Sequence, residues 1–165
     1  MQTVYRICGI VGTGAMGRGI AQMAAQAGSD VILFDAHEGA AREAREALNE
    51  TWQKLVAKGK LDASQAQVYA TRLKQAASVN DLATCDLVIE AIVEKLDVKQ
   101  RLFQQLEGVV RPDTVLATNT SSLSVTAIGA ALKHPSRLAG YHFFNPVPLM
   151  KVVEVIAGLK TSPQV

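Results

Sequence analysis

The sequence has few of the residues, and none of the long segments, that mark several classes of protein. Its 165 residues contain two cysteines, Cys8 and Cys85, which are too few for a disulfide-stapled secreted domain and lack metal-ligand spacing. No run approaches the ~20 apolar residues of a membrane span. The first residues, MQTVYRICGIVG, are typical of a strand and not of a leader peptide. We therefore expect reduced thiols in a cytoplasmic protein with no membrane partner.

An excess of one charge is also missing. Lysine and arginine number 17 against 15 acidic residues, and the two signs are interspersed, for a formal net charge of +2. Nucleic-acid-binding proteins usually concentrate basic residues on one face, so we expect no nucleic-acid partner. With 48% hydrophobic and 19% charged residues, the composition is that of a globular domain with a sizeable core.

Strand-like and helix-like stretches alternate along the chain. Apolar runs of strand length alternate with segments whose apolar residues recur every three or four positions, which predicts an α/β fold with a mainly parallel, doubly wound sheet. A helix pair is predicted after the second strand, where Asp62 and Gln65 suggest a capping box, and Ser124 is a candidate N-cap. The predicted strands are 5–11, 31–34, 77–79, 87–92, 114–118, 138–144 and 152–156, and the predicted helices are 15–27, 38–58, 62–73, 95–106 and 125–132.

The chain's last residues carry a separate signal. Thr161-Ser162-Pro163 has the chemistry of a helix start, yet the sequence stops at Val165. We therefore expect residues 1–165 to be one domain from the N-terminal part of a longer protein.

A glycine motif lies between the first strand and the first helix. Its six residues fit G-x-G-x-x-G, a turn in which backbone and helix N-terminus bind a pyrophosphate. Asp35 ends the second strand, where a carboxylate binds the adenosine ribose, and the following Ala36-His37 offers no arginine for a 2′-phosphate. These features predict a Rossmann-type site for NAD in preference to NADP. Alternatively, the glycines make only a turn and Asp35 caps the next helix. The motif residues are Gly12, Thr13, Gly14, Ala15, Met16 and Gly17.

Other polar residues follow later strands, at the edge where such sheets bind ligands. His142 lies in AGYHFFNPVP, and Glu154 interrupts the apolar run VVEVI. A carboxylate in an apolar strand needs a partner, and pairing with His142 would leave one imidazole nitrogen free to take a proton from a substrate hydroxyl. Ser121 could bind the same oxygen. Taken alone, a buried histidine is more often structural, but a dinucleotide site at the same edge favours catalysis.

Four segments resemble one family closely. GTGAMGRGIA, DLVIEAIVEKLDVKQRLF, ATNTSSLSVTAI and AGYHFFNPVPLMKVVEVI are similar to the NAD-binding domain of L-3-hydroxyacyl-CoA dehydrogenases, including the bacterial 3-hydroxybutyryl-CoA type. The resemblance implies that His142 is the base, that Glu154 orients it and that Ser121 lies near the reacting oxygen. It also implies contacts from Asn145 to acyl-CoA, and from Asp35, Glu94 and Lys99 to NAD. Asn119, in the NTSSL segment, is a further cofactor-site candidate.

The resemblance also implies that a helical segment at about 37–73 receives coenzyme A. Thr51 and Lys58 fall on the family's CoA-contacting serine and lysine, and the threonine is a departure from that pattern. Lys54, Lys58 and Lys60 could bind CoA phosphates, or they could form a solvated face on which Glu50 pairs with Lys54.

The family's second domain is not found in these residues. That all-helical domain closes the cleft and usually carries the homodimer interface. The expected function is NAD-dependent oxidation of an L-3-hydroxyacyl-CoA to a 3-oxoacyl-CoA in fatty acid or related acyl-CoA degradation. Two alternatives are a non-catalytic NAD-binding module and a β-hydroxy acid dehydrogenase domain, although the latter usually uses a lysine base.

Overall fold

The computed structural model describes residues 5–165 and contains a seven-stranded sheet of order β3-β2-β1-β4-β5-β6-β7. The first six strands pair in parallel, and β7 pairs antiparallel with β6. The chain crosses over between β1 and β4, so the carboxyl ends of these strands form the ligand crevice of a doubly wound sheet. The strands are β1 (Ile7–Val11), β2 (Asp30–Phe34), β3 (Leu73–Gln75), β4 (Leu87–Glu90), β5 (Val115–Thr118), β6 (Leu138–Phe143) and β7 (Val153–Ala157).

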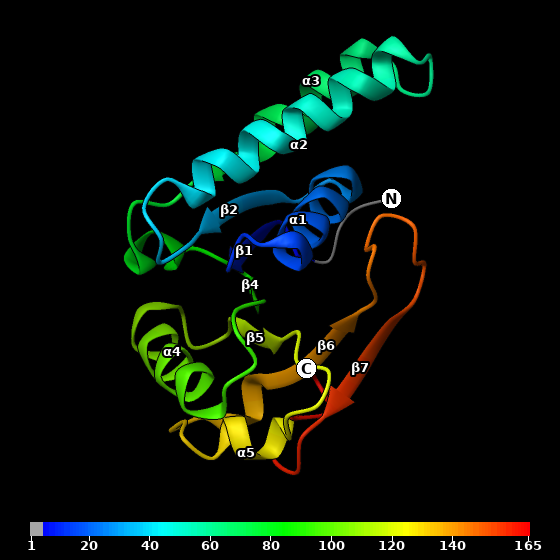
Figure 1. Cartoon of the computed structure of the whole chain (residues 1–165). Helices are drawn as coiled ribbons and strands as arrows, with labels where there is room; N and C mark the ends of the chain where they lie inside the picture. The colour runs from blue at the N-terminus through cyan, green and yellow to red at the C-terminus, as the bar shows by residue number, and fades with distance from the viewer. Residues whose placement is uncertain (1–4) are drawn as a thin grey trace.

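The helices cover the two halves of the sheet. Figure 1 shows α2 and α3 as a long antiparallel pair beside α1, over the half that contains β1 and β2, whereas α4 and α5 lie over the other half. The predicted helix pair between the second and third strands is therefore confirmed. The α-helices are α1 (Ala15–Ala27), α2 (Ala40–Ala57), α3 (Ala63–Arg72), α4 (Leu96–Val109) and α5 (Val125–Gly129), and two 3₁₀ helices, η1 and η2, span Val79–Leu82 and Pro135–Arg137.

Burial explains why the strands lack polar-apolar alternation. Every residue of β4 and β5 is buried, because helices cover both faces of the central strands. One apolar cluster includes Ile10, Ile20 and Trp52, and a second includes Phe103, Leu116 and Ile128. The crevice is thus anchored to a rigid, close-packed core.

Some local expectations were wrong. The third strand is Leu73–Gln75 instead of 77–79. The carboxylate of Asp81 accepts hydrogen bonds from the N–H groups of Ala77 and Ser78, which precede η1. Asp62 occupies the N-cap position of α3 but makes no side-chain cap, so the expected capping box is absent. The expectation for Ser124 is confirmed, since its hydroxyl accepts from Ala127 N–H at 3.2 Å.

The β6–β7 hairpin forms one edge of the molecule. Its connection reaches back to α1 (Figure 1), where Val147 packs against Gly19. All five residues of β7 are exposed, which corrects the expectation of a buried strand around Glu154. The first four residues of the run expected to form the N-terminal strand lie outside the described part. No helix within residues 5–165 is long and apolar enough to cross a membrane.

Candidate functional site

The glycine turn has the geometry of a phosphate cradle. Gly12 has a φ of +90°, and a Cβ there would lie 2.7 Å from the Ala91 carbonyl oxygen. A Cβ on Gly17 would collide with the Gly12 carbonyl oxygen, which explains the third glycine. A Cβ on Gly14 would meet no protein atom within 4 Å, so protein packing does not require that glycine. Because α1 lacks a side-chain cap, its first N–H groups are available to an anion.

The remaining motif residues contribute in different ways. Ala15 begins α1 and is exposed, so its backbone borders the open side of the turn. The Met16 side chain packs against the core cluster. Thr13 is buried, and both its N–H and its hydroxyl donate to Asp35 Oδ2, at 2.7 and 2.9 Å. The first two strand ends are therefore joined through one carboxylate.

Asp35 and the glycine turn line a common cavity of about 580 Å³. His37 also borders it, and its N–H and Nδ1 lie 3.0 and 3.2 Å from Asp35 Oδ1. Burial opposes the charge of Asp35, but the hydrogen bonds from His37 and Thr13 outweigh it and hold the pKa of the carboxyl below its ordinary value. Asp35 is therefore a carboxylate at neutral pH, as a ribose acceptor must be.

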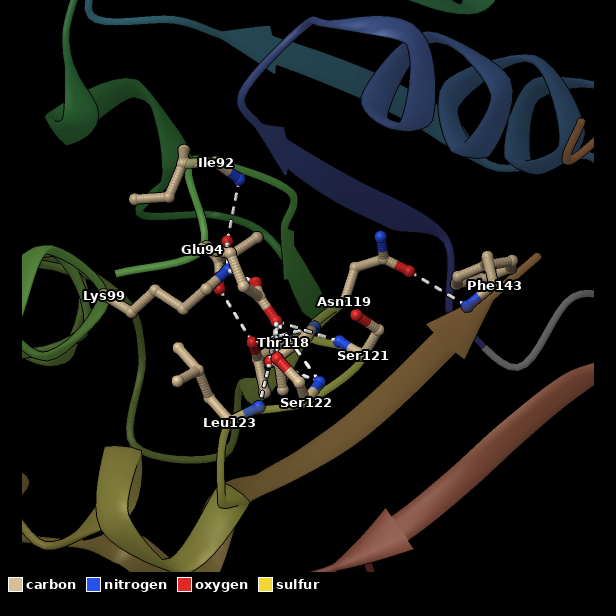
Figure 2. A network of polar contacts seen from close by, with 11 residues as sticks. Ile92, Glu94, Lys99, Thr118, Asn119, Ser121, Ser122, Leu123 and Phe143 are labelled. Atoms are coloured by element: carbon tan, nitrogen blue, oxygen red, sulfur yellow. Dashed lines mark hydrogen bonds and ion pairs between the residues drawn. The ribbon is translucent and has the colours of Figure 1, made fainter. Parts of the chain in front are cut away.

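Glu94 and Lys99 belong to a polar network at the ends of β4 and β5 (Figure 2). Lys99 is 1% exposed, and its Nζ lies 2.5 Å from Glu90 Oε1 and 3.2 Å from Glu94 Oε2. The other Glu94 oxygen accepts from Ser121 N–H at 3.0 Å, from Ser122 N–H at 3.3 Å and from the Thr120 hydroxyl. Although partial burial opposes the charge, these contacts with Thr120 and Lys99 lower the pKa of Glu94. Lys99 thus faces two carboxylates instead of the open crevice.

Asn119 connects this network to the sixth strand. Its Oδ1 accepts from Phe143 N–H at 2.9 Å, next to His142, and its own N–H donates to the Glu90 carbonyl oxygen at 2.8 Å (Figure 2). Ser121, two residues further, is exposed. Ser121 and His142 line a second cavity, of about 300 Å³.

The predicted pair of His142 and Glu154 is present. The two residues are directly paired across β6 and β7, and His142 Nδ1 lies 2.9 Å from Glu154 Oε2. The Phe144 ring packs 4.5 Å from the imidazole, centroid to centroid. The side chains of His142 and Glu154 are 20% and 57% exposed. The pair was predicted on the assumption that the Glu154 carboxylate is buried, and that assumption was wrong. Their contact results from strand register, and Nε2 has no hydrogen-bond partner within residues 5–165.

Three predicted substrate residues line neither cavity. Asn145 is exposed just after β6. Thr51 and Lys58 are exposed on the outer part of the α2–α3 pair, and the Thr51 hydroxyl donates to Ala47 O at 2.8 Å. Lys54 pairs with Glu50 at 3.7 Å, as the solvated-face alternative expected.

Sequence reasoning missed Glu90 and Thr118, and it gave no role to Thr120, which it placed at the ligand edge of the sheet. Glu90 is fully buried, and its Oε2 accepts from the Thr118 hydroxyl at 2.8 Å. A signal was available, because Glu90 ends the apolar run LVIE and Lys99 follows within the next helix. Buried charges require a partner.

The comparisons with known proteins point to one family. Residues 7–165 match the family model described as "3-hydroxyacyl-CoA dehydrogenase, NAD binding domain". A curated 3-hydroxyadipyl-CoA dehydrogenase from Escherichia coli is 46% identical over 94% of this chain and 33% of that protein. A probable 3-hydroxybutyryl-CoA dehydrogenase from Deinococcus radiodurans is 44% identical over 94% of this chain and 56% of its own length.

Solved structures give the same result. The crystal structure of a 3-hydroxybutyryl-CoA dehydrogenase from Escherichia coli superposes with a TM-score of 0.95 at 44% identity, over 99% of this chain and 34% of that one. The crystal structure of the (S)-3-hydroxybutyryl-CoA dehydrogenase from Ralstonia eutropha superposes with a TM-score of 0.92 at 39% identity, over 97% of this chain and 56% of that one. The chain therefore spans between a third and somewhat more than half of these proteins.

Proposed function

This chain belongs to the family of 3-hydroxyacyl-CoA dehydrogenase NAD-binding domains, and from that premise we propose that the intact protein oxidises an L-3-hydroxyacyl-CoA to the 3-oxoacyl-CoA with NAD. The observation that carries the proposal is the His142–Glu154 pair beside a cavity that also contains Ser121. A general base and a hydroxyl-binding residue are what an alcohol oxidation requires of the protein. We further propose that residues 1–165 act as one domain that includes the α2–α3 segment.

The cofactor fits the crevice between β1 and β4. The open cradle at Gly14 and the uncapped start of α1 suit a pyrophosphate, and Asp35 suits a ribose diol. We assign Thr13 to holding Asp35, the backbone of residues 12–17 to the phosphates, and Glu94, with Asn119 beside it, to the nicotinamide half. Lys99 acts through Glu94 in this assignment, because its side chain is buried. When bound, NAD accepts the hydride.

The protein's own step is a proton transfer. With Nδ1 bonded to Glu154, the neutral imidazole of His142 accepts the substrate hydroxyl proton at Nε2. The carboxylate fixes the ring orientation and stabilises the imidazolium that forms. Ser121 donates to the same substrate oxygen, and Asn145 positions the acyl chain. Thr51 and Lys58 bind the CoA moiety, where Lys58 attracts a phosphate.

The first test is an assay in which the intact protein reduces acetoacetyl-CoA with NADH. The reaction is followed as the loss of NADH absorbance. General bases contribute about 10²- to 10⁴-fold, so His142→Ala should lower kcat at least a hundredfold. It should leave NADH affinity within about tenfold, which is ~1.4 kcal/mol. Normal turnover by the alanine variant would remove His142 from the mechanism.

The same assay separates the alternatives. A non-catalytic NAD-binding module would bind NADH without turnover, and a β-hydroxy acid dehydrogenase would accept free 3-hydroxy acids that lack CoA. A panel of 3-hydroxyacyl-CoA thioesters would then define the preferred acyl chain and the pathway. The acyl-chain length that is oxidised fastest indicates the pathway.

The proposal extends to assembly and compartment. We propose a homodimer that forms through residues outside this chain, as the resemblance implies, and sedimentation of the intact protein measures its mass. We also propose a cytoplasmic location, which is supported by two buried, unpaired cysteines. Burial raises the pKa of Cys85 to about 12, so that thiol is not poised for oxidation.

A further inference from the structure

A buried carboxylate without an assigned role lies beneath the nicotinamide half of the site. Glu90 is 0% exposed at the end of β4, and it accepts from Lys99 Nζ at 2.5 Å, from Ile92 N–H at 2.7 Å and from the Thr118 hydroxyl at 2.8 Å. All three donors belong to the protein and the side chain is completely buried, so Glu90 does not face a ligand. A buried ion pair is weak evidence for stability, because well-packed apolar residues often replace one without loss.

The contacts of Lys99 indicate what the pair does. Its ammonium is enclosed, at 1% exposure, between Glu90 and Glu94. A buried ammonium is costly unless it is paired with a carboxylate, and Glu94 alone, at 37% exposure, is a partly solvated partner. Glu90 is the fully desolvated counter-charge.

Glu94 transmits this arrangement to the loop after β5. One of its oxygens accepts from Lys99, while the other accepts from the N–H groups of Ser121 and Ser122 and the Thr120 hydroxyl (Figure 2). The Thr120 oxygen also accepts from Leu123 N–H at 2.9 Å. Through these hydrogen bonds the Glu94 carboxylate holds the backbone of residues 120–123 in place, and this backbone sets the position of Ser121.

We propose that Glu90 is a positioning residue: its charge keeps Lys99 in the interior, Lys99 holds Glu94, and Glu94 fixes the loop that orders the nicotinamide half of the cofactor and Ser121. The proposal deepens the proposed function and depends on it only for the turnover measurement. The adenosine half, bound at β1 and β2, lies on the other side of the crossover and should not respond.

The test compares binding of NADH with binding of ADP-ribose, which lacks the nicotinamide, by calorimetry on the intact protein. Wild type should bind NADH more tightly. Glu90→Gln preserves the size of the side chain and removes its charge. This variant should weaken NADH at least about tenfold while ADP-ribose affinity stays within about twofold. It should lower kcat for acetoacetyl-CoA reduction by a similar or larger factor.

Two further variants separate positioning from stability. Glu90→Gln alone leaves the buried Lys99 without its desolvated partner and should lower the melting temperature. Glu90→Gln/Lys99→Met removes both charges, so the melting temperature should recover, whereas the NADH defect should persist because Glu94 is no longer held. Glu107→Gln is the matched control on α4, where Glu107 pairs with Arg137 at 3.8 Å and both side chains are nearly buried. It should lower the melting temperature and leave both affinities within about twofold.

Several results would overturn the proposal. These are unchanged NADH affinity in Glu90→Gln, a parallel loss of ADP-ribose and NADH, equal wild-type affinities for the two ligands, or recovery of NADH binding in the double variant. If wild type binds NADH but does not reduce acetoacetyl-CoA, the proposed function fails, and the binding comparison still decides the role of Glu90.

Discussion

At the scale of single residues, the site depends on carboxylates that hydrogen-bond donors of the protein hold in place. Asp35, Glu90 and Glu94 each accept from at least three donors, and Glu154 accepts from His142. A carboxylate held in this way keeps its orientation and its charge, which is what binding of a ribose or an imidazolium requires. The consequences can be tested one side chain at a time.

Glu154→Gln should reduce turnover without preventing folding. The amide keeps the size of the side chain but removes the charge that stabilises the imidazolium, and a hydrogen bond to a charged group contributes about 1.5–3 kcal/mol. Because Glu154 is 57% exposed, we expect kcat to fall about 10-fold, with NADH affinity unchanged. Steady-state rates with acetoacetyl-CoA measure this. Wild-type kcat in the variant would mean that the carboxylate does not assist His142.

Asp35→Asn should weaken NAD by about tenfold, because an amide offers one acceptor oxygen where two ribose hydroxyls and Thr13 compete. The matched control is Asp30→Asn, an exposed residue at the start of the same strand. Calorimetry with NAD compares the two variants. Equal affinities would show that the ribose contact is misassigned.

At the scale of elements, the inner face of the α2–α3 pair packs on the core, whereas its outer face presents the residues proposed to contact CoA. Trp52 is fully buried and packs against Tyr69, with ring centroids 5.6 Å apart, whereas its neighbour Thr51 is exposed. The periodicity of α2 predicted this helix, because its buried residues recur at helical spacing.

Trp52→Ala should lower the free energy of unfolding by about 3–5 kcal/mol, the usual cost of truncating a buried large aromatic side chain. Thr51→Ala should change it by less than about 0.5 kcal/mol, because it alters an exposed position. Urea unfolding compares both variants with wild type. If the proposed CoA contact is correct, Thr51→Ala also raises KM for acetoacetyl-CoA. A small effect of Trp52→Ala would mean that the pair docks without its aromatic contact.

At the scale of the whole molecule, the same carboxylates link stability to pH. The pKa of Asp86 is lowered because, against the effect of burial, the Arg111 side chain and the N–H groups of Ile7 and Arg6 hold its charged form. The pKa values of Asp35 and Glu94 are lowered too. A depressed folded-state pKa stabilises the fold above the unfolded value and loses that contribution as pH falls through the folded value. The ordinary values are 3.8 and 4.5.

The free energy of unfolding should therefore decline as pH falls below about 4.5, because the unfolded state then binds more protons than the folded one. Urea titrations between pH 7 and pH 3 measure the decline. Asp86→Asn should make the acid limb shallower, and Asp113→Asn, an exposed partner of the same arginine, serves as control. An acid limb as steep in Asp86→Asn as in wild type would exclude Asp86 as a contributor.

Sequence patterns were sufficient to predict the alternating elements, the glycine turn before α1 and the carboxylate that follows β2. These features are local: each depends on residues close together in the chain, whose spacing fixes backbone geometry. The sequence did not predict that β7 is exposed, because an apolar strand has the same residue pattern whether or not another element covers it. The third strand was misplaced for a related reason, since three residues give too short a pattern.

Tertiary packing was needed to identify the partners of Lys99, whereas the His142–Glu154 pair was predicted from the sequence. The enclosure of Lys99 by Glu90 and Glu94 follows from how α4 packs on β4 and β5, and the 2.9 Å contact of His142 with Glu154 follows from antiparallel register. Both contacts join residues on different elements. Such pairs form because the side chains are close in space, and the spacing of residues in the sequence does not specify that distance. The sequence supplied the charges, and packing decided their pairing.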